Sequence, residues 1–78
     1  MSRLPLYSSD EIIKALQRGG FETRKTKSGH MSLRRPKRKG EGSDVTVVPM
    51  GKKEIPRGTF ANILRLANVE VDDFLKWL

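Results

Sequence analysis

Residues 29–49 read GHMSLRRPKRKGEGSDVTVVP and decide the fold, because two strand-like runs flank a polar, glycine-rich connection. Met31–Arg34 alternates apolar and polar side chains, and Val45–Val47 does so more clearly before Pro49 ends the run. The connection Pro36–Ser43 is too polar and too glycine-rich to pack, and it predicts a long hairpin loop. The stretch therefore predicts two antiparallel strands.

A helix is predicted on the N-terminal side of these strands. Ser8 and Glu11 have the spacing of a capping box, and an apolar stripe at helical spacing follows them. Gly19-Gly20 should end the helix, because glycine accepts the left-handed conformation of a C-cap. The weak alternation of Phe21–Thr26 then predicts a third strand, with Phe21 and Thr23 facing inward.

Two helices are predicted on the C-terminal side. Four apolar residues from Phe60 to Ala67 recur at i, i+3, i+4 and i+7, and Pro56 suits the start of that helix. Asn68 can provide a left-handed stop. The last short helix, Val71–Leu78, has two aspartates in its first turn, which complement the helix dipole. Its apolar face is expected to consist of Phe74, Leu75, Trp77 and Leu78.

The order of elements predicts an α+β fold, α-β-β-β-α with a short C-terminal helix, in a single domain over residues 1–78. Two amphipathic helices and a three-stranded antiparallel sheet can bury each other only if both helices lie on one sheet face. The opposite face, with its basic side chains, should be open to solvent. Trp77 is expected to fold back onto the core, and the alternative is an apolar edge for another chain.

The charge of the chain indicates a polyanionic partner. The net charge is +7, and the stretch 23–40 contains eight Lys or Arg residues and no acid. Such a block favours phosphate backbones, although a solvated loop is the simpler interpretation. An anionic membrane is disfavoured because no large apolar face is interleaved with the charge. No cysteine is present, which excludes disulfides and thiolate metal sites, and no metal or other cofactor is expected. Without a secretory signal or an apolar run long enough to span a bilayer, the sequence predicts a cytoplasmic protein.

His30 is the only histidine in the chain and stands at the start of a predicted strand. Imidazole is the side chain whose unperturbed pKa lies near neutrality, so it can give or take a proton at cellular pH. One such group among many Lys and Arg residues suggests chemistry on a phosphodiester. The simpler interpretation of His30 is a turn residue that is hydrogen-bonded to the backbone.

A set of short motifs, in order and spacing, resembles the HicA family of bacterial toxins, which are small RNA-cleaving proteins paired with HicB antitoxins. The resemblance runs from Ser9 to about Leu75 and rests on Gly20-Phe21, Ser28-Gly29-His30, Val47-Val48-Pro49, Lys53–Phe60, Ile63-Leu64 and Asp73-Phe74. It implies a fold like a double-stranded-RNA-binding domain and a toxin of a type II toxin–antitoxin system. It also implies that the chain is an mRNA interferase with His30 as its catalytic residue, covered by a HicB-like antitoxin when bound.

Two positions depart from the family pattern. Family members commonly read Gly-Ser-His where this chain has Ser28-Gly29-His30, and many carry a further histidine where this chain has Gly51. The second departure leaves any helper role of that histidine unfilled, so that activity could be weaker, or water or a lysine could carry the second proton.

The chemistry expected from these residues is metal-independent RNA cleavage by attack of a ribose 2′-hydroxyl on phosphorus. It needs a base, an acid and positive charge for the phosphorane oxygens, and His30 could be either the base or the acid. The candidate RNA contacts are Lys27, Arg34, Arg35, Lys37, Arg38, Lys39, Lys52 and Lys53. Gly58 and Thr59 could offer backbone N–H groups to a phosphate at a helix N-terminus, although plain helix initiation also explains them. The alternative function is a non-catalytic RNA-binding module with the same fold.

Overall fold

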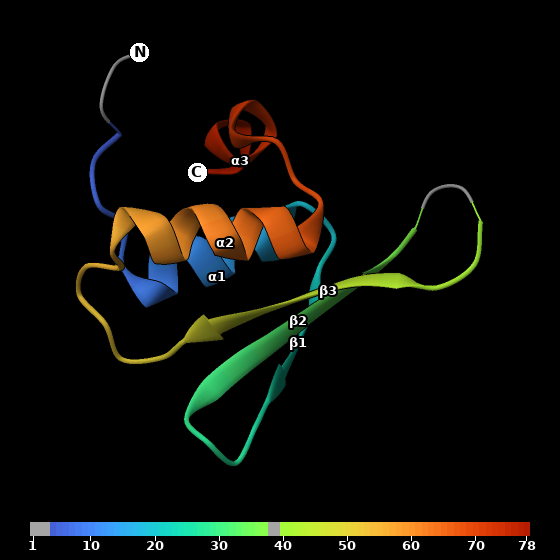
Figure 1. Cartoon of the computed structure of the whole chain (residues 1–78), viewed down its shortest axis with the longest axis horizontal. Helices are drawn as coiled ribbons and strands as arrows, with labels where there is room; N and C mark the ends of the chain where they lie inside the picture. Colours follow the sequence, from blue (N-terminus) through green and yellow to red (C-terminus); the bar gives the residue numbers. More distant parts are fainter. Residues whose placement is uncertain (1–3, 38–39) are drawn as a thin grey trace.

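The computed structural model describes residues 4–37 and 40–78, and its elements follow the predicted order (Figure 1). The elements are α1 (Ser9–Arg18), β1 (Glu22–Lys25), β2 (His30–Pro36), β3 (Ser43–Pro49), α2 (Arg57–Ala67) and α3 (Val71–Trp77). The predicted α+β fold is thereby confirmed. No helix of the described residues is long and apolar enough to span a membrane.

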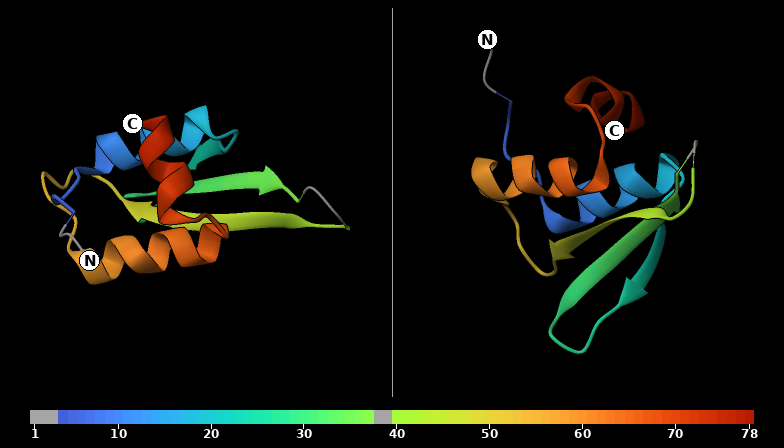
Figure 2. Two further views of the ribbon diagram at one scale, coloured as in Figure 1. Left: turned by 90° about the horizontal axis from the view of Figure 1, so that it is seen from above. Right: turned by 45° about the vertical axis from the view of Figure 1, so that its right-hand side comes forward.

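The sheet is an antiparallel meander in which β2 lies between β1 and β3. The helices α1 and α2 cover one face of this sheet, and α3 lies on the side of these two helices that faces away from the strands (Figures 1 and 2). Among the described residues, no helix covers the other face, which we call the open face. The β2–β3 pairing runs from His30 opposite Pro49 to Pro36 opposite Ser43, so the hairpin loop is shorter than predicted.

Helix α1 begins at the predicted capping box. The backbone N–H of Glu11 donates to Ser8 Oγ (3.1 Å), and the N–H of Ser8 donates to Glu11 Oε1 (2.9 Å). Its C-terminal glycines differ from each other: Gly20 takes the left-handed conformation (φ +99°), whereas Gly19 does not. Gly19 is instead required for space, because a Cβ there would lie 2.5 Å from the ring of Trp77.

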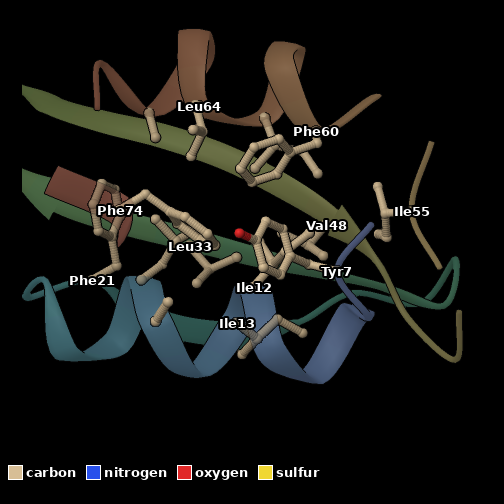
Figure 3. Close-up of a cluster of buried hydrophobic side chains, with 14 residues drawn as sticks. Tyr7, Ile12, Ile13, Phe21, Leu33, Val48, Ile55, Phe60, Leu64 and Phe74 are labelled. Carbon is tan, nitrogen blue, oxygen red and sulfur yellow. The ribbon is translucent and has the colours of Figure 1, made fainter. Parts of the chain in front are cut away.

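The hydrophobic core lies between the sheet and the helices (Figure 3). At its centre, three aromatic rings from the N-terminal segment, α2 and α3 pack together. Their ring centroids are 5.4 Å apart for Tyr7 and Phe60, 5.4 Å for Tyr7 and Phe74, and 5.0 Å for Phe60 and Phe74. These tilted and edge-to-face pairs add to the apolar burial, and they attach α3 to the rest of the fold.

The side chains of β3 alternate in the opposite sense to that expected from polarity. Thr46 and Val48 are buried, whereas Val45 and Val47 are 46% and 41% exposed on the open face. Thr46 is tolerated inside because its hydroxyl donates to the backbone carbonyl of Ile63 in α2 (2.7 Å), so no buried polar group is left unpaired. The alternation predicted for this run is therefore present, and its apolar members Val45 and Val47 lie on the open face.

The structure of the two C-terminal helices agrees only in part with the prediction from the sequence. Asn68 ends α2 in the left-handed conformation (φ 56°), as predicted, and Pro56 lies at the N-cap of α2. In α3, Phe74 is fully buried and Trp77 is half-buried against the core. Leu75 and Leu78, however, are exposed, so the apolar face of this short helix is narrower than expected.

Candidate active site

The tight connection between β1 and β2 places His30 at one end of the sheet. The backbone N–H of Thr26 donates to the His30 carbonyl (3.0 Å), which closes the turn. The carbonyl of Gly29 accepts from the N–H of Met50 (3.2 Å), just beyond β3. His30 is thus the first residue of β2, opposite Pro49, and it is joined to both neighbouring segments by backbone hydrogen bonds. The predicted turn histidine is confirmed as a structural feature.

The imidazole ring of His30 is half-buried and is held by a single residue. Its Nδ1 lies 3.1 Å from the backbone oxygen of Ser28 and 3.2 Å from Ser28 Oγ. Within the described part of the chain, both hydrogen bonds of the ring are made by Nδ1. Nε2 makes no hydrogen bond to these residues.

Three of the predicted contact lysines belong to the segments that meet at this end. Lys27 is in the β1–β2 turn, and Lys52 and Lys53 are in the loop that follows β3. All three side chains are exposed. Because the N–H of Met50 bonds to the β1–β2 turn, this loop begins beside His30. Gly51, one of the two positions that depart from the pattern expected from the resemblance, also lies in this loop.

Ser9 fixes the start of this loop, and sequence reasoning missed it. Its side chain is almost fully buried; its hydroxyl donates to the Pro49 carbonyl (2.5 Å) and accepts from the N–H of Lys52 (3.0 Å). The N–H of Ser9 also donates to the carbonyl of Lys52 (2.9 Å). A serine after a helix cap carries no signal of contacts that lie 40 and 43 residues away.

Of the remaining predicted RNA contacts, those that the structure describes do not lie at the same place. Arg34 is exposed on the open face, with Glu22 and Val45 as its neighbours across the strands. Arg35 is on the helix-covered face, where Nη1 donates to the Gly19 carbonyl (2.8 Å). Lys37, beyond the far end of β2, forms an ion pair with Asp44 (3.7 Å). Arg38 and Lys39 lie outside the described residues.

Arg35 has a structural role that the prediction of an RNA contact did not include. Its guanidinium carbon lies 4.5 Å from the ring centroid of Phe21 and 5.8 Å from that of Trp77. Two cation–π contacts and a hydrogen bond hold this side chain against the core. The guanidinium of Arg35 is thus engaged in contacts within the fold.

Gly58 and Thr59 occupy the first turn of α2, on the helix side of the sheet. Gly58 is exposed and Thr59 is half-buried, and no side chain caps the N-terminus of this helix. A phosphate contact there stays a prediction, separate from the open face.

The site is an open surface rather than a cavity. One hollow of about 500 Å³ lies between the N-terminal segment and α2, and another of about 740 Å³ lies beside Arg35, Asp44 and Trp77. Neither of them is lined by His30. Across residues 4–37 and 40–78, no group of three or more His, Asp or Glu side chains is placed to hold a metal ion.

Fold and site together define a small, basic α+β domain that presents a histidine at the end of an antiparallel sheet. A comparison with protein-family models matches residues 9–69 to the family described as HicA toxin of bacterial toxin-antitoxin systems. Since this match covers well over half of the chain, the protein belongs to the HicA toxin family. A search of curated proteins found no match.

Proposed function

We propose that this HicA-family toxin is an mRNA endonuclease that cleaves its substrate without a metal ion and uses His30 as its catalytic residue. The observation that carries this proposal is the placement of the histidine. Its ring is held through Nδ1 at the end of the sheet, between a turn and a loop that carry exposed lysines. A held proton-transfer group beside positive charge is the arrangement that phosphodiester cleavage needs.

The proposed reaction is an internal transfer within the RNA strand. The 2′-oxygen of a ribose forms a bond to the adjacent phosphorus while its proton passes to a base, and the bond from phosphorus to the 5′-oxygen breaks. The 5′-oxygen takes a proton from an acid, and the products are a 2′,3′-cyclic phosphate and a 5′-hydroxyl end. His30 supplies one of these two proton transfers, and water or a lysine ammonium supplies the other.

The proposed RNA contacts near the reacting phosphate are Lys27, Lys52 and Lys53. Positive charge at these positions would offset the charge on the phosphorane oxygens. Arg34 would contact the strand further along the open face, and Lys37 would contact it beyond the far end of β2. Contacts by Arg38 and Lys39 stay predictions from the sequence alone. These contacts would hold the backbone of the RNA without reading its sequence.

We also propose that a HicB-like antitoxin inhibits the toxin by covering His30 and the lysines around it. Membership in a toxin–antitoxin family supports the existence of such a partner. An acidic surface on the antitoxin would accelerate association with this basic region by electrostatic steering.

The experiment compares wild-type protein with His30→Ala on labelled RNA in the presence of EDTA. Removal of a general acid or base should lower the cleavage rate by about 10²–10⁴-fold. Far-UV circular dichroism and urea denaturation of both proteins establish that the variant is folded. Addition of the purified cognate antitoxin in equimolar amount should stop cleavage by the wild type.

Near wild-type cleavage by His30→Ala would contradict the assignment of the catalytic residue. Wild-type protein that binds the RNA but never cleaves it, in EDTA or with added divalent cations, would instead identify a non-catalytic RNA-binding module. Cleavage that occurs only with a divalent cation would contradict the metal-independent mechanism.

A further inference from the structure

A short chain of hydroxyl groups leads from the His30 ring back to its own backbone. Ser28 Oγ lies 3.2 Å from His30 Nδ1 and 3.1 Å from Thr26 Oγ1. Thr26 Oγ1 lies 3.0 Å from the backbone oxygen of His30. These contacts form a closed circuit within the β1–β2 turn, and none of them involves the other ring nitrogen, Nε2.

The direction of every hydrogen bond in this circuit follows from counting protons. A carbonyl oxygen can only accept, so Thr26 Oγ1 must donate its single proton to the His30 oxygen. The contact between the two hydroxyls then requires that Ser28 donates to Thr26 Oγ1. Ser28 has no proton left, so it can only accept from His30 Nδ1, which must carry the proton.

A second contact leads independently to the same result. His30 Nδ1 also lies 3.1 Å from the backbone oxygen of Ser28, and that oxygen has no proton to give. Both acceptors therefore require the proton to be on Nδ1. In a neutral imidazole only one nitrogen is protonated, so the lone pair must be on Nε2.

We infer that Ser28 and Thr26 are positioning residues that keep the proton of neutral His30 on Nδ1, so that Nε2 is the base that takes the proton of the 2′-hydroxyl. The inference rests on the proposed function for its chemical role, and it decides between the two roles that the sequence left open for His30. The resulting imidazolium keeps its Nδ1 proton in contact with Ser28 and carries the new proton on Nε2. Water or a lysine ammonium then protonates the 5′-oxygen.

The direct test is nitrogen-15 NMR of the imidazole in the RNA-free protein, with His30 as the only histidine to assign. At a pH where His30 is neutral, Nδ1 should show the shift of a protonated, pyrrole-like nitrogen and Nε2 that of an unprotonated, pyridine-like nitrogen. The opposite assignment would overturn the inference.

Two variants test the hydroxyl chain itself. Ser28→Ala removes one acceptor of the Nδ1 proton, and Thr26→Val keeps the side-chain shape but frees the Ser28 proton, which can then be donated to Nδ1. Both should increase the population with the proton on Nε2 and lower the cleavage rate by about 2- to 10-fold, the effect of one hydrogen bond, without changing RNA affinity. Ser28→Thr keeps the hydroxyl, so it should retain the wild-type tautomer and the wild-type cleavage rate.

Ser43→Ala is the matched control, because it deletes the same hydroxyl at the far end of the sheet. It should leave the tautomer as in the wild type. An equal change of tautomer in Ser43→Ala, or none in Ser28→Ala and Thr26→Val, would overturn the role of the hydroxyl chain.

The dependence of the rate on pH separates a base from an acid. The neutral fraction of His30 grows as pH rises, so a base gives a rate that increases through the titration measured by NMR on the same sample. After subtraction of the His30→Ala rate, a decrease over that range would overturn the assignment as base. If the NMR result is as expected but His30→Ala cleaves like the wild type, the proposed function fails and the positioning circuit stands.

Discussion

Arg34 and Arg35 are neighbours in the chain, but their side chains lie on opposite faces of the sheet. Arg34 is exposed on the open face, whereas Arg35 lies over the ring of Phe21 and donates to the Gly19 carbonyl. Both belong to the same basic block, and both were predicted to contact RNA. The difference arises because successive side chains of a strand point to opposite faces.

The same conservative substitution should therefore have different effects at these two positions. Arg35→Lys loses the planar group that stacks on Phe21 and the directed hydrogen bond to Gly19, so it should lower the free energy of unfolding by about 1–2 kcal/mol. Arg34→Lys keeps the charge on an exposed site and should change stability by no more than about 0.5 kcal/mol. Urea denaturation of both variants provides the measurement. Equal effects would mean that the contacts of Arg35 do not stabilise the fold.

At the scale of the residue, the sequence predicted that His30 stands at a turn before a strand, but not the groups that contact its ring. The position of His30 in a turn before a strand was predicted, because the histidine and the alternating run are adjacent in the sequence. Ser9 was not found, because its partners at Pro49 and Lys52 become neighbours only in the folded chain. Thr26 and Ser28 are close to His30 in sequence, yet their role depends on hydroxyl directions that spacing does not give.

At the scale of the element, strand β3 buries a polar side chain and exposes two apolar ones. Thr46 faces the core and bonds to the Ile63 carbonyl, while Val45 and Val47 face solvent. The sequence predicted the alternating run Val45–Val47, but it assigned no face to these residues, and the strand is longer, Ser43–Pro49. Register across β2 settles the face, since Thr46 is opposite the fully buried Leu33. The alternation within one β-strand does not show which residues of the neighbouring strand lie opposite.

A lysine introduced at adjacent positions of β3 tests this orientation. Val47→Lys places the charge on the open face and should change the free energy of unfolding by no more than about 1 kcal/mol, the range of strand propensities. Thr46→Lys would bury an unpaired ammonium group, which costs several kcal/mol and should unfold a domain of ordinary stability, about 5–15 kcal/mol. Circular dichroism and urea titration distinguish the two. If Val47→Lys were less stable than Thr46→Lys, Val47 rather than Thr46 would face the core.

At the scale of the whole molecule, the described lysines among the predicted RNA contacts lie at both ends of the sheet. Lys27, Lys52 and Lys53 belong to the segments at the His30 end, whereas Lys37 lies beyond the other end and is paired with Asp44. The length of β2 separates the ends by about 20 Å at roughly 3.3 Å per residue. The basic block is continuous from 23 to 40 in the sequence, whereas the fold places Lys27 at one end of β2 and Lys37 beyond the other end.

We expect the lysines at the His30 end of the sheet to contribute more to RNA affinity than Lys37 at the other end. Replacement of Lys27, Lys52 and Lys53 by Gln removes three proposed phosphate contacts and should reduce the slope of log affinity against log salt by roughly 2, at about 0.7 for each contact with a single strand. Lys37→Gln should reduce it by less than about 0.7, since Asp44 already offsets its charge. Titrations of labelled single-stranded RNA at several salt concentrations measure both slopes. An unchanged slope in the triple variant would show that these lysines do not contact RNA and contribute only to solubility.

The packing of Trp77 against Gly19 has a practical consequence for spectroscopy. Trp77 is the only tryptophan in the chain, and its ring is half-buried between the end of α1 and Arg35. Its fluorescence therefore comes from one known position, the contact of α3 with the rest of the fold. Detachment of α3 would expose the indole to water and shift its emission to longer wavelength, even with the sheet intact. Fluorescence thus reports on the C-terminal helix, and the circular dichroism of the backbone reports on the whole domain.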